Sequence, residues 1–209
     1  MSDRLVWIDC EMTGLDLVAD ALIEVAALVT DFDLNVLGDG VDIVIKPPDK
    51  ALEQMDPFVR DMHTTSGLLD VLDAGMTLEA AQDQVLDYVK KHCGSDSRPP
   101  LAGNTVATDR AFLDRDMKDL ASFLHYRIVD VSSIKELSRR WFPKAYYNAP
   151  VKSGGHRALA DIRESIEELR YYREAVFVPQ PGPDAEESRR IAAIHAGALT
   201  GVKPGAEPA

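Results

Sequence analysis

Three stretches near the N-terminus carry the apolar patterns of β-strands. Residues 5–12, 21–31 and 36–46 are rich in apolar and β-branched side chains, and Asp, Asn and Gly residues typical of turns separate the second from the third. We therefore predict a three-strand meander over about residues 4–46, although the second stretch also fits a helix. Residues 47–75 contain the breakers PPD and MDP, which predict irregular structure with short helices.

The following residues alternate between helical and strand patterns. Residues 77–92 repeat apolar side chains at a spacing of about 3.6 residues, which predicts an amphipathic helix that begins at Thr77. Strands are predicted at RPPLAGN and YRIVDVS, helices at TDRAFLDRDM, SSIKELSRRWF and residues 157–175, and a loop at PKAYYNAPVKSGG. A meander followed by alternating helices and strands predicts an α/β fold with a mixed sheet covered by helices.

The composition changes at about residue 178. The chain has 209 residues and is 45% hydrophobic, enough for one substantial core. The later segments VPQPGPDAEES and GALTGVKPGAEPA are instead rich in Pro, Gly and Ala. We predict one domain over residues 1–177 and a largely disordered tail over residues 178–209, in which SRRIAAIHAGAL could form a short helix.

Charge and cysteine content restrict the partners and the location. The formal net charge of −12 argues against tight non-specific binding of long nucleic acid, because such binding requires Lys and Arg to neutralise many phosphates. A short anionic substrate at a metal-loaded site remains possible. Cys10 and Cys93 lack the number and spacing of a disulfide framework or a zinc site. Because we find neither a membrane-span pattern nor a basic region followed by an apolar one at the N-terminus, we expect a cytoplasmic protein with no membrane partner.

Two carboxylates interrupt the first predicted strand. Side chains alternate across a strand, so Asp9 and Glu11 share a face with Leu5 and Trp7, whereas the opposite face is apolar throughout. Mutual repulsion and partial burial would both disfavour ionisation of this pair unless a cation lay between them. The alternative is a strand end that emerges into solvent, where acidic residues are common.

Two later acids could complete a metal site. Asp109 follows a Gly-Asn turn, in or near the first turn of a helix, where the helix dipole alone would favour an acid. Asp161 lies at the edge of the apolar stripe of residues 157–175, a position that otherwise marks where the buried face ends. All four acids fall at strand ends or core-facing helix edges, and four oxygen ligands at one rim suit Mg²⁺ or Mn²⁺ rather than zinc.

One histidine is a candidate general base. His156 lies five residues before Asp161, a separation of about 140° around a helix axis, so both could not share one helical face. Gly154 and Gly155 indicate that His156 lies on a loop or first turn, from which it could reach a site that contains Asp161. Its unperturbed pKa of about 6.5 suits a base. The alternative is a solvent-exposed loop histidine.

The order of Asp9, Glu11, Asp109, His156 and Asp161 resembles that of the DEDDh group of 3′-to-5′ exonucleases. Longer phrases resemble the oligoribonuclease family within this group: WIDCEMTGLD, HTTSGL, LAGNTVATDRAFL, HYRIVDVSSIKELSRRW and HRALADIRES. The resemblance extends over about residues 4–177 and does not include the tail. It implies a ribonuclease H-like fold, with a mixed five-stranded sheet flanked by helices.

The resemblance also implies an activity and roles for individual residues. It implies a homodimer that degrades very short RNA, especially 5′-phosphorylated dinucleotides, to mononucleotides with two Mg²⁺ or Mn²⁺ ions in each active site. By this resemblance the metal ligands are Asp9, Glu11, Asp109 and Asp161, and the general base is His156. The implied substrate contacts are Leu15 as a wedge between the bases, Phe58 as a stacking aromatic, His63 as a phosphate contact, and Thr105, Tyr126, Arg127 and Ser132 as phosphate-cap groups, with Tyr126 a candidate for supply by the partner subunit.

Two positions depart from the family pattern, and other functions stay open. The family commonly has Trp at the position of Phe58 and Ser at that of Thr105; Phe stacks with less area, and Thr keeps the hydroxyl but adds a methyl group. The remaining alternatives are packing roles for Leu15, Phe58 and Tyr126 and solvated surface positions for His63 and Arg127. Competing hypotheses are a general DEDDh exonuclease acting on longer RNA ends or DNA, and a catalytically silent nucleotide-binding or dimerisation module.

Overall fold

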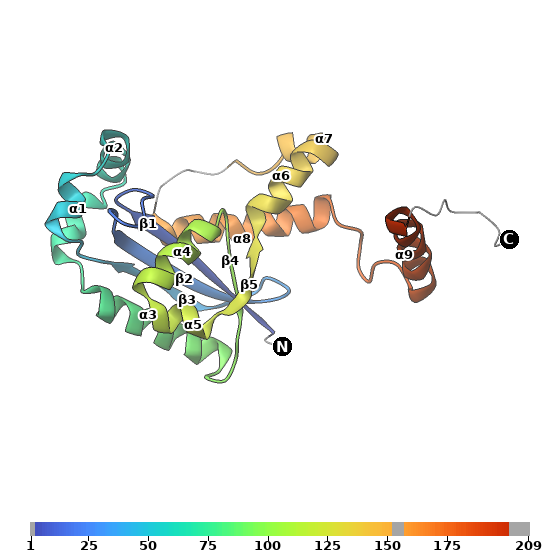
Figure 1. Cartoon of the computed structure of the whole chain (residues 1–209), viewed down its shortest axis with the longest axis horizontal. Coiled ribbons are helices and arrows are strands. Elements are labelled where there is room, and N and C mark those ends of the chain that lie inside the picture. Colours follow the sequence, from blue (N-terminus) through green and yellow to red (C-terminus); the bar gives the residue numbers. More distant parts are fainter. Residues whose placement is uncertain (1–2, 152–156, 201–209) are drawn as a thin grey trace. The chain divides into compact units, whose positions relative to one another are not determined.

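A computed structural model of the chain describes residues 3–151 and 157–200, which fall into two units, Met1–Ala175 and Val176–Ala209. The first unit contains the sheet (Figure 1). Its strands are β1 (Arg4–Met12), β2 (Leu22–Asp31), β3 (Val36–Val44), β4 (Pro100–Gly103) and β5 (His125–Asp130). Its helices are α1 (Asp49–Glu53), α2 (Pro57–Thr65), the 3₁₀ helix η1 (Leu69–Ala74), α3 (Leu78–Cys93), α4 (Ala107–Asp116), α5 (Lys118–Phe123), α6 (Val131–Trp141), α7 (Pro143–Tyr147) and α8 (Ala158–Ala175).

The five strands form one mixed sheet in the order β3-β2-β1-β4-β5. Strands β1, β2 and β3 are antiparallel neighbours, which confirms the predicted meander, while β4 runs parallel to β1 and β5 runs parallel to β4. The C-terminal ends of β1, β4 and β5 therefore meet at one rim of the sheet. In open sheets with parallel strands, this rim is where ligands bind.

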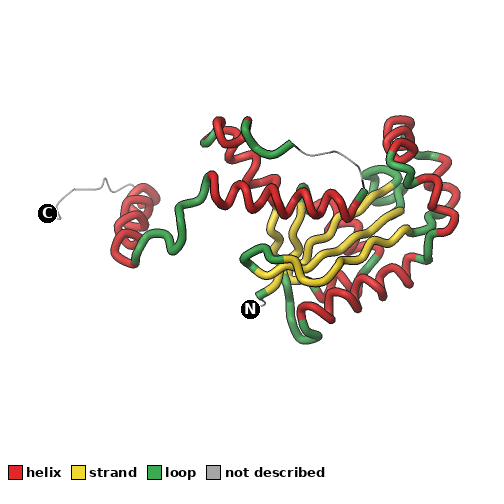
Figure 2. Tube along the Cα trace, turned by 180° about the vertical axis from the view of Figure 1, so that it is seen from behind, coloured by secondary structure: helices red, strands yellow, loops and turns green. Residues whose placement is uncertain are grey.

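Alternation along β1 divides its side chains between two helical layers. Val6, Ile8 and Cys10 belong to the main core cluster, together with residues of α3, α4 and α5. On the opposite face, which α8 covers, Leu5 and Trp7 are buried, and the indole Nε1 of Trp7 donates to Thr30 Oγ1 at 2.9 Å. Figures 1 and 2 show α8 on one side of the sheet and α3 on the other. Both faces are thus filled by helices, as the sequence predicts.

Two helices lie where the sequence predicts loop or disorder. Helix α7 falls within the predicted loop, and Pro143 at its first turn is a start signal that the sequence analysis did not use. In the second unit, α9 (Ala185–Thr200) occupies part of the segment expected to be largely disordered. Asp184 Oδ1 accepts the backbone N–H groups of Glu186 and Glu187 and so caps this helix. This helix includes SRRIAAIHAGAL, the stretch for which the sequence analysis allows a short helix.

Within the described part of the chain, helix length and hydropathy do not reach what a membrane-spanning helix needs.

Candidate active site

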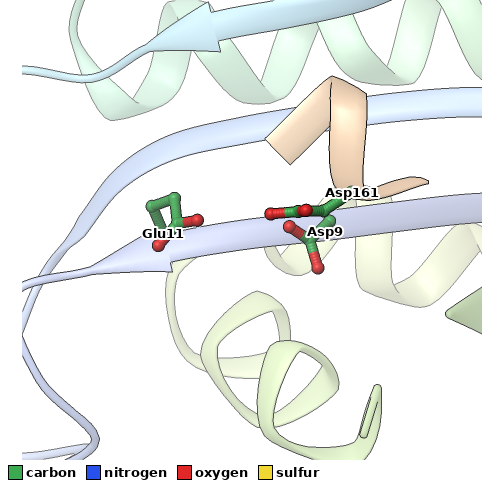
Figure 3. Close-up of side chains that lie close together, drawn as sticks. All are labelled: Asp9, Glu11 and Asp161. Atoms are coloured by element: carbon green, nitrogen blue, oxygen red, sulfur yellow. The ribbon is translucent and has the colours of Figure 1, made fainter. Parts of the chain in front are cut away.

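Three carboxylates meet where β1 passes beneath the start of α8. Asp9 and Glu11 lie two residues apart on the α8 side of β1, and Asp161 comes from the first turn of α8. One carboxylate oxygen from each residue lies within 4.8 Å of those of the other two. Figure 3 shows the three side chains together above the strand. The alternation of β1 and the edge position of Asp161 together produce this arrangement.

Burial and repulsion make ionisation of this group unfavourable. The pKa of Asp9 rises from 3.8 to about 9, mainly because the side chain is buried and then because Asp109 and Glu11 are close. The pKa of Glu11 rises from 4.5 to about 8, again through burial first and then through Glu24 and Asp161. Neutral carboxylic acids or a bound cation would relieve this repulsion. The alternative of a fully solvated strand end is therefore wrong.

Asp109 stands beside this group rather than within it. It lies in the first turn of α4, is buried, and accepts the backbone N–H of Cys10 through Oδ1 at 2.9 Å. Burial raises its pKa from 3.8 to about 6, while the N–H of Cys10 is among the hydrogen bonds that lower it. Asp109 is therefore held against β1 next to Asp9, on the side away from α8.

The donor set fits a hard divalent cation. All the candidate ligand atoms are carboxylate oxygens, which suit Mg²⁺ or Mn²⁺. The separation of 4.8 Å or less is close to the roughly 4 Å between opposite ligands of an octahedral Mg²⁺ ion. A cation here would also supply the positive charge that the raised pKa values of Asp9 and Glu11 call for.

A fifth carboxylate, which the sequence analysis missed, lies next to the cluster but has a cation of its own. Glu24 on β2 pairs with Glu11 across the sheet and is fully buried. Its Oε1 accepts from the Arg157 guanidinium at 2.7 and 2.8 Å, and its Oε2 accepts from Ala158 N at 3.0 Å. This pair therefore fixes the start of α8, four residues before Asp161. An acid inside the apolar run LIEVAAL was the available signal.

The two histidines proposed for the site have different outcomes. His156 lies outside the described residues, between the described Val151 and Arg157. His63 is 0% exposed, and its Nε2 donates to the carbonyl of Met12 at 2.9 Å, since a carbonyl can only accept. Its Nδ1 lies 3.9 Å from Glu11 Oε2. We therefore place His63 behind Glu11, which contradicts the alternative of a surface position, while its contact with a phosphate stays a prediction.

The candidate wedge and stacking residues are exposed, so the packing alternative is wrong for them in this chain. Leu15 is 73% exposed in the β1–β2 loop, and Phe58 is 77% exposed at the start of α2. The loop is held by Asp20, which accepts from Thr13 Oγ1 and from the backbone of residue 16 at 2.9 Å each. A Cβ on Gly14 would lie 2.3 Å from Asp20 Oδ2, so this close approach requires glycine.

The four candidate phosphate-cap residues separate into two pairs. Thr105 and Ser132, which follow β4 and β5, have hydroxyl oxygens 3.1 Å apart at the same rim as the carboxylates. Tyr126 and Arg127 lie at the opposite end of β5, where the guanidinium lies 5.5 Å from the tyrosine ring centre. Tyr126 is 77% exposed, which contradicts a packing role within the chain, while Arg127 is exposed as its surface alternative proposed. Only Thr105 and Ser132 thus lie at the rim that carries the carboxylates.

Comparisons with known proteins agree with this arrangement. A family model described as exonuclease matches residues 6–169. The chain is 70% identical to the oligoribonuclease of Streptomyces avermitilis, over 93% of this chain and 98% of that protein. It is 59% identical to the oligoribonuclease of Mycobacterium tuberculosis, over 92% of this chain and 90% of that protein.

Solved structures show the same fold at lower identity. Exonuclease I from Methylocaldum szegediense superposes with a TM-score of 0.64 at 20% identity, over 86% of this chain and 41% of that one. E. coli exonuclease I in complex with a dA16 oligonucleotide gives a TM-score of 0.67 at 15% identity, over 83% of this chain and 41% of that one. The chain thus spans less than half the length of these structures, and the shared part is a ribonuclease H-like fold.

The mixed sheet, the carboxylates at its rim and these matches agree on one class of enzyme, a nuclease with 3′-to-5′ exoribonuclease activity. The chain belongs to the oligoribonuclease family of exonucleases.

Proposed function

We propose that the protein hydrolyses very short 5′-phosphorylated oligoribonucleotides, chiefly dinucleotides, and releases 5′-mononucleotides. The observation that carries this proposal is that a cluster of three carboxylates and a pair of hydroxyls lie at the same rim of the sheet. The carboxylates belong to Asp9, Glu11 and Asp161. The hydroxyls belong to Thr105 and Ser132. The carboxylates suit a cation at the scissile phosphate, and the hydroxyls suit a terminal phosphate close by.

The catalytic part of the proposal concerns hydrolysis of the phosphodiester. Asp9, Glu11, Asp109 and Asp161 would hold two Mg²⁺ or Mn²⁺ ions, which supply activation of water and stabilisation of the leaving oxygen when they are bound. His156 accepts a proton from the attacking water, whose oxygen forms a bond to phosphorus. The bond from phosphorus to the 3′ oxygen breaks, and that oxygen leaves as a 3′ hydroxyl after taking up a proton from solvent.

The exposed residues of the site would hold the two nucleotides. Phe58 stacks on one base, Leu15 separates the two bases, and the Thr105–Ser132 pair binds the 5′ phosphate. A cap at the 5′ phosphate leaves no room for a third nucleotide on that side. Length selectivity is then steric, and little sequence preference follows because no base edge is read.

A second copy of the chain would supply Tyr126. The strand register aligns Val129 of β5 with Ala102 of β4 and Trp7 of β1. Along the common strand direction, Tyr126 lies three residues before these aligned residues, and Asp9 lies two residues after them. At about 3.3 Å per residue, they are separated by roughly 16 Å along the strands. This distance within one chain supports a position for Tyr126 at the site of another subunit. Its exposure supports this placement.

Exposed apolar side chains on consecutive elements from β5 to α7 support a homodimer. They are Ile128 on β5, Leu137 and Trp141 on α6, Phe142, and Tyr147 on α7. Exposed apolar side chains are buried when proteins associate, and Trp and Tyr are enriched at such interfaces. We also propose a cytoplasmic location, since Cys10 and Cys93 are both free thiols.

The experiment that tests the function compares initial rates on 5′-phosphorylated RNA of two and seven nucleotides and on a DNA dinucleotide, with Mg²⁺ or Mn²⁺ present. We expect the RNA dinucleotide to be cleaved fastest. Faster cleavage of the 7-mer would favour a general exonuclease, and no cleavage with either metal would favour a silent binding module.

A further inference from the structure

Asn104 connects the proposed phosphate cap to the helix that carries Asp161. It lies directly after β4 and is half-buried. Its Nδ2 donates to Ser165 Oγ at 2.7 Å and to Glu168 Oε2 at 3.1 Å, both on α8. Its Oδ1 accepts from Ser132 Oγ at 3.0 Å. One amide side chain thus joins the segment after β5 to α8.

The carboxylate of Glu168 fixes which way the Asn104 amide points. Glu168 is buried and pairs with Lys135 Nζ at 3.1 Å, so it is held as an ionised acceptor. An ionised carboxylate cannot donate, so the nitrogen of Asn104 must face it and the oxygen must face Ser132. The amide orientation is therefore set by chemistry.

This orientation determines the direction of hydrogen bonding at the cap. Ser132 has one hydroxyl proton, and Asn104 Oδ1 takes it. Ser132 Oγ then serves only as an acceptor toward Thr105, from its backbone N at 2.9 Å and its Oγ1 at 3.1 Å. Asp130 Oδ1 accepts the same Thr105 N–H at 3.0 Å. The Ser132 proton is held by Asn104, whereas the Thr105 hydroxyl can turn its proton from Ser132 toward a phosphate, because Ser132 Oγ still accepts the Thr105 backbone N–H.

The backbone of Thr105 supports a role in binding. Its φ is +55°, a left-handed conformation that is rare for a β-branched residue. The hydrogen bonds from its N–H to Asp130 and Ser132 hold it there. Such strained residues persist where the surroundings over-determine them, commonly at ligand sites.

The same network reaches the carboxylate cluster. Ser165 Oγ, which accepts from Asn104, donates to the backbone carbonyl of Asp161 at 2.8 Å. A continuous series of hydrogen bonds thus joins the cap to the backbone of Asp161.

We propose that Asn104 is a positioning residue that makes Thr105 the hydroxyl donor to the 5′ phosphate and so sets the preference for 5′-phosphorylated substrate. This role rests on the proposed function, because it concerns the same substrate end. Without Asn104, the proton of Ser132 is free to turn, Thr105 loses its fixed acceptor, and the cap no longer presents one defined donor.

The test measures kcat and KM of the full chain with Mg²⁺ on one diribonucleotide, with and without its 5′ phosphate. For Asn104→Ala we expect KM on the phosphorylated form to rise about tenfold, a typical effect of one hydrogen bond to a charged group. The rate on the unphosphorylated form should change less than threefold. Thr105→Val should reproduce the loss, since it removes the donor itself.

Two further variants keep the outcome decisive. Asn104→Ser, which cannot reach Glu168, is expected to lose the preference in the same direction and serves if the alanine variant fails to fold. Lys135→Met removes the ion pair that holds Glu168 as an acceptor but leaves Asn104 and its bond to Ser165 in place, and should lower the preference less than Asn104→Ala. If the wild type prefers the 5′-phosphorylated substrate and the Asn104 variants keep the same preference, the role of Asn104 is wrong and the proposed function stands. A wild type that does not discriminate overturns the phosphate cap of the proposed function as well, and equal losses on both substrates assign Asn104 to the fold.

Discussion

The carboxylate cluster and the exposed substrate contacts are two parts of one candidate site, and folding treats them oppositely. Asp9 and Glu11 are largely buried, and the pKa of each is raised by burial and by neighbouring carboxylates. Leu15 and Phe58 stand in solvent with at least 73% of their surface exposed. Residues of the first kind oppose folding until a cation binds, whereas those of the second kind hardly affect it. Substitutions in the carboxylate cluster should therefore change both activity and stability, whereas substitutions of the exposed contacts should change activity and leave stability nearly the same.

The largest effect is expected from removing one carboxylate of the cluster. Asp161→Asn should lower the rate on a 5′-phosphorylated diribonucleotide by more than about 100-fold, since even partners of metal ligands cost 10- to 100-fold when mutated. In a chelator the same change should raise the melting temperature, because Asp161 is among the charges that raise the pKa of Asp9 and Glu11. Steady-state rates and thermal denaturation measure the two effects.

Glu167→Gln is the matched control on the same helix, because this carboxylate is exposed and pairs with Arg170 on the surface of α8. It should change neither quantity appreciably. A lower melting temperature for Asp161→Asn in chelator would mean that the cluster stabilises the fold, and the contrast with the exposed contacts would then be wrong.

The sequence could predict the cluster because local periodicity contains its geometry. Alternation along β1 placed Asp9 and Glu11 on one face, and the apolar stripe of α8 placed Asp161 at its edge. Glu24 was missed because its role depends on its ion pair with Arg157, which is 133 residues away in sequence. The ion pair exists only once β2 and α8 are packed, and no local pattern expresses that packing.

Local sequence patterns also could not predict which polar residues are buried. His63 follows a helix start that the breaker MDP signals, but its position behind Glu11 depends on how α2 packs against the end of β1. The network around Asn104 likewise joins three elements that are distant in sequence. The strands, the main helices and the carboxylates could thus be predicted, whereas the residues that orient them could not.

The next largest effect concerns Arg157, the cation that compensates the fifth carboxylate. Arg157→Met should lower the free energy of unfolding by about 3 kcal/mol, because it leaves the fully buried Glu24 carboxylate without the cation that pairs with it. Arg163→Met on the same helix is the control, since Arg163 is exposed and donates to a carbonyl at 3.3 Å. It should change stability by less than about 0.5 kcal/mol. Chemical denaturation measures both, and equal changes would show that Glu24 does not need its partner.

A smaller effect is expected from pH. In chelator the folded state holds protons on Asp9 and Glu11 more tightly than the unfolded state, since their folded pKa values are about 9 and 8. Stability should therefore fall as pH rises from the unfolded pKa values toward the folded ones, by about 1.4 kcal/mol per pH unit for each carboxyl that is protonated only in the folded state. Mg²⁺ competes with these protons, so its stabilising effect should grow over the same range.

Thermal denaturation at several pH values, with and without Mg²⁺, tests this linkage. The Asp161→Asn variant is the control, because it removes one source of the raised pKa values and should flatten the pH dependence in chelator. Stability that rises from pH 6 to pH 8 in chelator would contradict the protonated cluster.

The smallest effect is expected where the side chain is already exposed. Phe58→Ala should leave stability within about 0.5 kcal/mol, since Phe58 is 77% exposed and its backbone N–H keeps Asp56 as its acceptor. KM for the dinucleotide should rise about tenfold with kcat little changed, because stacking on one base contributes about 1–3 kcal/mol of binding. Phe58→Trp, with more stacking area, should lower KM.

Val18→Ala is the matched control for this last prediction, because Val18 is 95% exposed in the β1–β2 loop and the change keeps its backbone N–H bond to Asp16. If Val18→Ala raised KM and Phe58→Ala did not, the base would stack on the β1–β2 loop rather than at the start of α2. If both variants lost stability instead of substrate affinity, exposed apolar side chains here would serve an interface between subunits. The contrast with the carboxylates would then concern assembly, because the apolar residues would be buried by a second copy of the chain and not by a base.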